Sequence, residues 1–202
     1  MPQLLLATSN THKTQEVAAM LGEEWEVLDL RAFPGITLPE ETGSTFEENA
    51  IIKAQGGSVA APGMLVLADD SGLEVDILNK QPGVRSARYA GDDATDADNR
   101  RMLKDRLRRV SVNPGQVFAG RFRCCLALVR DGQVLHISSG SVEGHVSIIE
   151  RGKGGFGYDS MFTPLDHKRS FGQLAPEVKN ALSHRARAMA AMQGWLKENP
   201  QA

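Results

Sequence analysis

Cysteine is scarce in this sequence of 202 residues: there are two, Cys124 and Cys125, and they are neighbours. Adjacent side chains of an extended strand point to opposite faces, so these two thiols cannot readily form a disulfide with each other. The sequence also has no CxxC pair and no cluster of histidine with cysteine, which argues against a structural zinc site. We therefore predict two buried free thiols in a reducing compartment.

Long apolar runs and an excess of charge of one sign are missing as well. The net charge of −2 provides no broad basic surface and aromatic residues make up 5% of the chain, which argues against a nucleic-acid partner. No apolar run approaches the ~20 residues that span a bilayer. Residues 1–3 and the short apolar run 4–7 lack the charged segment and longer apolar core of a signal peptide. We expect a cytoplasmic protein with no membrane partner.

What the sequence does contain is an interspersed series of strand and helix signals, in a chain long enough for one domain or two tightly packed lobes. Strands are predicted over residues 4–7, 25–30, 64–68, 73–77, 118–129 and 134–138. Helices are predicted over residues 14–21, over 96–109, near 176–182 with Pro176 at the first position, and from 183 onward. A further helix runs to about 59 from one of two possible capping boxes, Ser44 with Glu47 or Thr45 with Glu48. Because the turn Asp131-Gly132 makes the last two strands antiparallel, we predict a mixed sheet in a single α/β or α+β domain over residues 1–202.

A polar loop joins the first predicted strand to the first helix. It begins Thr8-Ser9-Asn10, and Lys13 lies where the helix starts. A helix N-terminus offers unpaired N–H donors and partial positive charge, and hydroxyls with a lysine added there would hold a polyphosphate. The glycines and the GK[ST] ending of a Walker A loop are absent. The plainer alternative for this segment, taken alone, is a solvated loop with a capping residue.

Two carboxylates, Asp69 and Asp70, follow a buried strand and precede Ser71-Gly72. Charges in such a place are costly unless a cation or hydrogen-bond donors compensate them. Carboxylate oxygens suit Mg²⁺, which takes one or two carboxylates together with substrate phosphates. The alternative is an Asx turn closed by the glycine. Glu40-Glu41 could complete a carboxylate cluster or be a solvated acidic pair, and Lys53 shares a helix face with core residues, an unusual place for a cation.

Two later segments carry groups that could bind a base. In the glycine-rich stretch 154–159, Phe156 could stack on a base and Asp159 could accept a proton from it, although a flexible turn is the default for such a pattern. Farther along, Lys179 precedes Ser183-His184-Arg185 at the start of the last helix. Cations oppose the helix dipole there, and an incoming base or phosphate would compensate them; ordinary surface charge is the alternative.

Together these segments outline a nucleotide–metal site, and in this order they resemble the inosine triphosphate pyrophosphatase family. The matching segments are Ala7-Thr8-Ser9-Asn10 with Lys13, Glu40-Glu41-Thr42-Gly43 with Thr45-Phe46, Glu48-Asn49-Ala50 and Lys53-Ala54, Ala68-Asp69-Asp70-Ser71-Gly72-Leu73, Pro82-Gly83 with Ser86-Ala87-Arg88-Tyr89, Gly154-Gly155-Phe156-Gly157-Tyr158-Asp159, and Ser183-His184-Arg185. The likeness covers nearly the whole chain. It departs at Ser9, where glycine is common, and at Ser160, where proline often follows the Tyr-Asp pair.

The resemblance implies an α/β homodimer in which two lobes surround a central mixed sheet, with the active site in the cleft between the lobes. It implies Mg²⁺-dependent hydrolysis of ITP, dITP and XTP to monophosphate and pyrophosphate, which removes deaminated purines from the nucleotide pool. Asp70 would be the general base that activates a water for attack on the α-phosphorus. The metal ligands would be Glu40 and Asp70, followed by Asp69 and Glu41. The substrate-binding residues would be Thr8, Ser9, Asn10, Thr11, His12, Lys13, Lys53, Ser71, Phe156, Gly157, Tyr158, Asp159, Lys179, His184 and Arg185.

Overall fold

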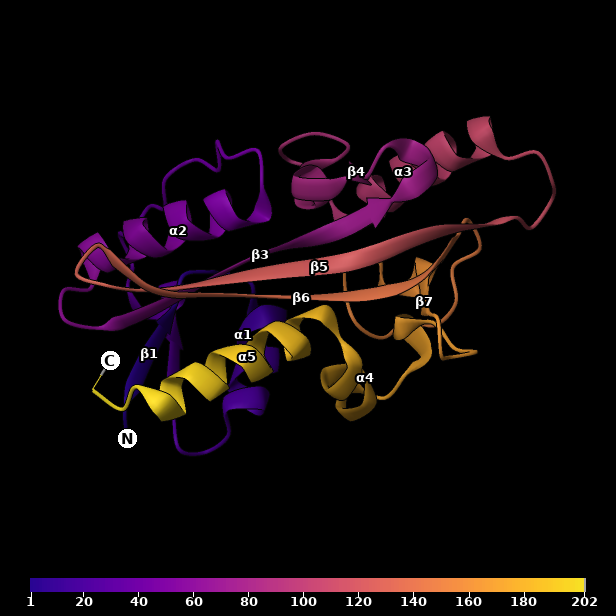
Figure 1. The fold of residues 1–202 in the computed structure, drawn as a ribbon. Helices are drawn as coiled ribbons and strands as arrows, with labels where there is room; N and C mark the ends of the chain where they lie inside the picture. The colour runs from indigo at the N-terminus through magenta and orange to yellow at the C-terminus, as the bar shows by residue number, and fades with distance from the viewer. Residues whose placement is uncertain (202) are drawn as a thin grey trace. The chain divides into compact units, whose positions relative to one another are not determined.

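The computed structural model describes residues 1–201, and within them it has seven strands and five α-helices (Figure 1). The strands are β1 (Gln3–Leu6), β2 (Glu26–Asp29), β3 (Leu65–Val75), β4 (Gln81–Pro82), β5 (Val117–Arg130), β6 (Gln133–Ser147) and β7 (Phe162–Pro164). The α-helices are α1 (Thr11–Leu21), α2 (Phe46–Ala60), α3 (Asp96–Val110), α4 (Pro176–Leu182) and α5 (His184–Glu198). Short 3₁₀ helices cover Leu30–Ala32, Asp76–Leu78, Gly83–Arg88, Asp159–Met161 and Phe171–Gln173. Over the described residues, every helix is too short or too polar to cross a membrane.

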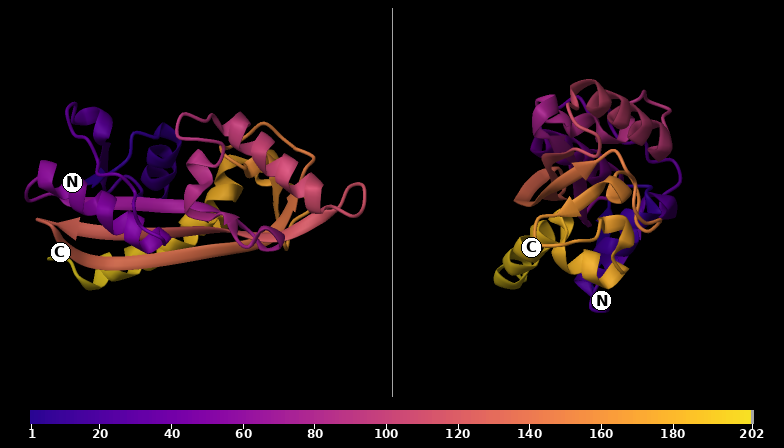
Figure 2. Two further views of the ribbon diagram at one scale, coloured as in Figure 1. Left: turned by 90° about the horizontal axis from the view of Figure 1, so that it is seen from above. Right: turned by 90° about the vertical axis from the view of Figure 1, so that its right-hand side faces the viewer.

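The strands form one mixed sheet in the order β2-β1-β3-β5-β6-β7, with β4 paired to β3. β1 runs parallel to both β2 and β3, whereas the pairs β3–β4 and β6–β7 are antiparallel. The long strands β5 and β6 are neighbours joined by a two-residue turn (Figure 2, left). Both turn residues have positive φ, 50° at Asp131 and 77° at Gly132, as a tight hairpin requires. The predicted mixed α/β sheet is confirmed.

The chain divides into two compact units, of which the first comprises residues 1–70, 124–140 and 185 onward. Side chains of β1 alternate between the faces of its sheet, and Leu4 and Leu6 pack with Val17 of α1 and Met189 of α5 in one buried cluster. Figure 1 shows α1 and α5 on one side of these strands and α2 on the other. On the α2 side, a Cβ at Gly57 would lie 3.0 Å from Val66, so the glycine permits a close helix–sheet approach.

The second unit comprises residues 71–123 and 141–184 and has its own core. Leu103 and Leu107, one turn apart on α3, are fully buried in it. Phe122 of β5 lies at the centre of an aromatic group, edge-on to Phe162 with ring centroids 4.8 Å apart and stacked on Phe171 at 6.0 Å. Such aromatic pairs contribute about 0.5–1.5 kcal/mol beyond the area they bury. This core therefore fixes β5 next to the loops that follow β6.

Three expectations about the elements need correction. Strand β3 continues through residues 65–75, so Asp69 and Asp70 lie within a strand and not beyond its end; cations on both sides of the strand, described below, compensate their burial. Helix α1 begins at Thr11, three residues earlier than its apolar spacing indicated, because Asn10 caps it there. Strand β6 extends to Ser147 instead of ending at 138, since its outer half pairs with β7.

Candidate active site

The loop between β1 and α1 has the strand–loop–helix arrangement expected of a phosphate-binding site. The Asn10 side chain caps α1 and accepts hydrogen bonds from the backbone N–H groups of His12 at 3.0 Å and Lys13 at 3.3 Å. The Thr8 hydroxyl in turn accepts from the backbone N–H of Asn10 at 3.2 Å. These contacts fix the loop and start the helix so that Lys13 lies in its first turn. The other predicted residues of this loop, Ser9, Thr11 and His12, are exposed.

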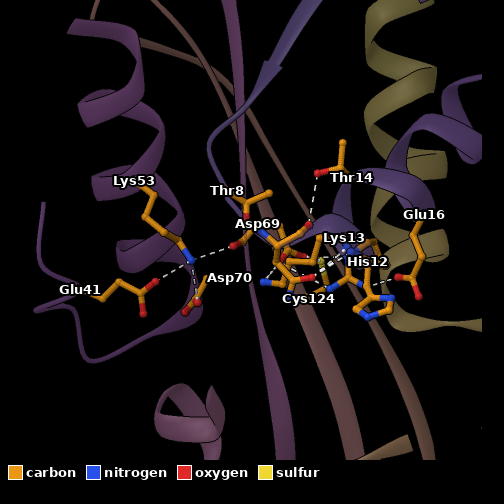
Figure 3. Close-up of polar contacts among 12 residues, drawn as sticks. Thr8, His12, Lys13, Thr14, Glu16, Glu41, Lys53, Asp69, Asp70 and Cys124 are labelled. Carbon is orange, nitrogen blue, oxygen red and sulfur yellow. Dashed lines mark hydrogen bonds and ion pairs between the residues drawn. The ribbon is translucent and has the colours of Figure 1, made fainter. Parts of the chain in front are cut away.

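Asp69 is a buried carboxylate held by two cations and a thiol (Figure 3). Lys13 forms an ion pair with its Oδ1, Arg185 Nε lies 3.0 Å from its Oδ2, and the Cys124 thiol donates to Oδ2 at 3.0 Å. Arg185 also forms an ion pair with Glu16 of α1. Two carboxylates, Asp69 and Glu16, therefore contact two cations, Lys13 and Arg185. Burial alone would raise the pKa of Asp69, but the charges of Arg185 and Lys13 outweigh it and hold that pKa well below its ordinary value. Asp69 is therefore ionised throughout the neutral range.

Asp70, the next residue on β3, meets a different cation. Lys53 of α2 donates to Asp70 Oδ1 at 3.0 Å and to the backbone oxygen of Asp69 at 2.7 Å, and Glu41 Oε1 lies 2.8 Å from the same Nζ (Figure 3). Burial raises the pKa of Asp70, the nearby Glu41 charge raises it further, and the Lys53 charge opposes both. Burial would lower the pKa of Lys53, but Asp70 and Glu41 together raise it. Lys53, on the core face of α2, therefore forms ion pairs with two carboxylates, those of Asp70 and Glu41.

The second oxygen of Asp70 fits a metal ligand. Asp70 Oδ2 is buried and has no hydrogen-bond partner, a costly state that a cation or a water would relieve. Within residues 1–201, no three histidine, cysteine, aspartate or glutamate side chains converge as a ready-made metal centre. A divalent ion held by Asp70 and Glu41 would therefore need further oxygens, such as those of a phosphate chain, and Mg²⁺ binds in this manner. Glu40 is exposed in the loop before α2.

The glycine-rich loop of the second unit is organised around Asp159. Its Oδ2 accepts hydrogen bonds from the backbone N–H of Phe156 at 2.9 Å and from Lys179 Nζ at 2.6 Å. Lys179 Nζ also lies 4.7 Å from the centroid of the Phe156 ring, within range of a cation–π interaction. A Cβ at Gly155 would come within 2.0 Å of Asp159 Oδ2, and this residue has a φ of +71°. Glycine is therefore required where the loop wraps around the carboxylate.

His184 lies flat against Phe122, with ring centroids 4.8 Å apart and an angle of 12° between the planes. The histidine is 5% exposed, so the aromatic group of β5 forms one wall of its surroundings. Tyr158 is also buried, and its hydroxyl donates to the backbone oxygen of Ser86 at 2.9 Å. Aromatic packing therefore fixes both side chains in the second unit.

The two units contain the residue types expected of a nucleotide–metal site. Comparison with known proteins identifies the family to which the chain belongs. The model of the Ham1 family matches residues 4–195. The chain belongs to the Ham1 family. A dITP/XTP pyrophosphatase of Geobacillus kaustophilus is 41% identical over 201 residues, which cover 98% of this chain and 96% of that protein. One of Geobacter sulfurreducens is 43% identical over 201 residues, covering 96% and 98% respectively. The structure of a HAM1 protein from Coxiella burnetii has a TM-score of 0.84 and 39% identity, covering 98% of this chain and all of that one.

In this Ham1 chain the predicted site residues fall into two groups, one in each unit. The first unit holds Thr8, Ser9, Asn10, Thr11, His12, Lys13, Glu40, Glu41, Lys53, Asp69, Asp70 and Arg185. The second unit holds Ser71, Phe156, Gly157, Tyr158, Asp159, Lys179 and His184. Arg185 was expected beside the base, yet it is 1% exposed and engaged with Asp69 and Glu16. Its role in substrate binding stays a prediction.

Sequence reasoning missed two residues that shape the Ham1 site. Glu16, the partner of Arg185, lies one turn after Lys13, and a search for an acid at i+3 on the helix could have found it. Phe122 lies in the predicted strand 118–129, but nothing in the pattern of that strand places His184 against its ring. Such a contact between distant segments has no local signal.

Proposed function

We propose that this chain hydrolyses dITP, ITP and XTP to the nucleoside monophosphate and pyrophosphate. It is a nucleoside-triphosphate pyrophosphatase by its family and by curated relatives of about the same length that carry the name dITP/XTP pyrophosphatase. The observation that supports the chemistry best is the contact of Lys53 on α2 with the buried Asp70 on β3 and with Glu41 of the loop before α2, with one oxygen of Asp70 left without a partner.

In the proposed reaction, Asp70 and Glu41 would hold Mg²⁺ with Glu40 as a further candidate ligand, whereas Asp69 is engaged with Lys13 and Arg185. The ion would supply charge neutralisation and orientation of the phosphate chain. Asp70 would accept a proton from a water aimed at the α-phosphorus. Its raised pKa suits this task, because a general base works best when its pKa is moved toward the working pH. Lys13 stabilises the departing pyrophosphate, exchanging part of its pairing with Asp69 for the phosphate oxygens.

Selection of the base is proposed to come from the second unit. Phe156 offers a ring for stacking, while Lys179 offers a donor to the 6-oxo group of hypoxanthine or xanthine. Adenine has a 6-amino group, which would face that donor with another donor. A mismatch of this kind can reduce kcat/KM by about 10⁴-fold or more.

The substrate preference tests this proposal directly. We expect kcat/KM for ITP, dITP and XTP to exceed the value for ATP by orders of magnitude, and GTP to be a poor substrate as well. Steady-state kinetics with pyrophosphate detection, with and without Mg²⁺, would measure this. Equal values for ITP, GTP and ATP would refute selection for deaminated purines, and unchanged turnover in EDTA would refute the metal.

The resemblance also leads us to propose a homodimer in the cytoplasm. Analytical ultracentrifugation would test whether the chain is a dimer in solution.

A competing function for the same carboxylates is a general triphosphatase that attacks the γ-phosphorus. That enzyme would release orthophosphate and not pyrophosphate, so product identity separates the two functions.

A further inference from the structure

The glycine-rich loop is held by a helix that the proposed function does not use. Helix α3 lies beside the segment that follows β6 (Figure 2). At its first residue, Asp96 Oδ2 accepts a hydrogen bond from the backbone N–H of Gly157 at 2.7 Å. One turn later, Arg100 Nη1 donates to the backbone oxygen of the same Gly157 at 2.8 Å. The backbone N–H and C=O groups of Gly157 are thus each bound by a side chain from one face of α3.

The same helix face also anchors the start of the loop. Glu150 Oε2 lies 3.0 Å from Arg100 Nε, and Lys104, one further turn along α3, forms an ion pair with Oε1. Ser160 completes the arrangement by donating to Glu150 Oε2 at 2.9 Å. Asp96, Arg100 and Lys104 therefore repeat every four residues and contact the loop at its apex and at its base.

The position of these contacts matters because the loop has no regular secondary structure. Residues 151–158 form no regular helix or strand, and Gly157 has a φ of +57° that side-chain-bearing residues rarely adopt. A Cβ at Gly157 would contact nothing, so glycine is present there for its backbone conformation and not for space. Phe156, the proposed stacking ring, is its direct neighbour. A mobile Gly157 peptide would leave that ring without a fixed orientation, and binding would then include the cost of ordering it.

We propose that Asp96 and Arg100 are positioning residues that hold the glycine-rich loop through Gly157 and thereby set the affinity for the base. We call their two hydrogen bonds to Gly157 the clamp. The role of Phe156 in this inference rests on the proposed function, whereas the clamp itself does not. Two other charged residues of α3, Asp98 and Arg101, provide matched controls. Asp98, two residues after Asp96, belongs to the capping box with Thr95, and Arg101 pairs with Asp98 on the exposed side of the helix.

The test compares Asp96→Ala with Asp98→Ala, two variants that each lose one carboxylate from the first turn of the same helix. Asp98→Ala weakens the helix cap, so it controls for stability and for the helix dipole. We expect Asp96→Ala to raise KM for ITP about fivefold with little change in kcat, because a hydrogen bond to an ionised group is lost. Asp96→Asn, which keeps an acceptor oxygen, should restore most of the affinity. Arg100→Ala should behave like Asp96→Ala, and Arg101→Ala like the wild type.

Two further readouts separate a positioning role from a general loss of stability. Inhibition by inorganic tripolyphosphate, which has no base, should be the same in Asp96→Ala and the wild type. Hydrogen–deuterium exchange of residues 152–160 should accelerate in Asp96→Ala and not in Asp98→Ala. Equal exchange in the two variants would overturn the clamp, whether or not ITP is a substrate. Accelerated exchange with KM values that do not differ would overturn its role in base affinity, and lack of ITP turnover in the wild type would instead refute the proposed function.

Discussion

Asp69 and Asp70 are neighbours on β3, yet their surroundings drive their pKa values in opposite directions. Side chains of a strand alternate, so Asp69 meets Lys13 and Arg185 while Asp70 meets Lys53. The first pKa is held well below its ordinary value and the second is raised. Adjacent acids with diverging pKa values are a common basis for divided roles in catalysis. Under the proposed function, this division assigns a structural charge to Asp69 and the general base to Asp70.

This division predicts the behaviour of Asp70→Asn. Turnover should fall by about 10²–10⁴-fold if Asp70 is the general base. Stability should not fall, because a raised folded-state pKa means that ionised Asp70 opposes folding at neutral pH, and the neutral amide removes that cost. Activity assays, with thermal unfolding at pH 7 in EDTA, would measure both effects. Near-normal turnover would exclude Asp70 from the role.

Asp69→Asn is the matched control, and we expect this variant to lose stability. Removing one partner of a buried ion pair costs about 3–5 kcal/mol. Since the folded-state pKa of Asp69 is lowered, its contribution is present above the unfolded pKa of about 3.9 and is lost as the pH falls through the folded value. The difference in unfolding free energy between variant and wild type should therefore be large at pH 7 and shrink in strong acid. A difference independent of pH would contradict this assignment.

At the scale of elements, short-range patterns were sufficient for most of the fold. The bounds of α4 were predicted from Pro176, and the two-residue turn at Asp131-Gly132 correctly joined β5 to β6. Both potential capping boxes before α2 were visible, and the structure selects Thr45 with Glu48. The continuity of β3 was missed because Asp69-Asp70-Ser71-Gly72 has the composition of a turn. Cations from distant helices compensate the two carboxylates within the strand.

The choice between the two capping boxes can be tested with a pair of variants. Thr45 accepts a hydrogen bond from the backbone N–H of Glu48 at 3.1 Å, whereas the Ser44 hydroxyl donates to the Glu48 side chain. Thr45→Ala should cost about 1 kcal/mol of unfolding free energy, and Ser44→Ala distinctly less. Urea denaturation of both variants would measure this. A larger loss in Ser44→Ala would show that the other box caps the helix.

At the scale of the whole molecule, most residues proposed for phosphate and metal binding belong to the first unit, and most of those proposed for the base, Arg185 excepted, belong to the second. The sequence predicted the membership of both groups through its resemblance to a family, while the partners of each residue came from the structure. Phe122 and the clamp from α3 have no counterpart in any short motif, because each acts through a contact between segments far apart in the chain. The expected position of the active site between two lobes stays a prediction.

The position of bond cleavage tests the central claim, that water activated by Asp70 attacks the α-phosphorus. Hydrolysis of ITP in ¹⁸O-labelled water with Mg²⁺, followed by mass spectrometry of the products, locates the attacked atom. We predict pyrophosphate as the leaving group and the ¹⁸O label in the phosphate of IMP. Label in pyrophosphate, or orthophosphate and IDP as the products, would contradict the account.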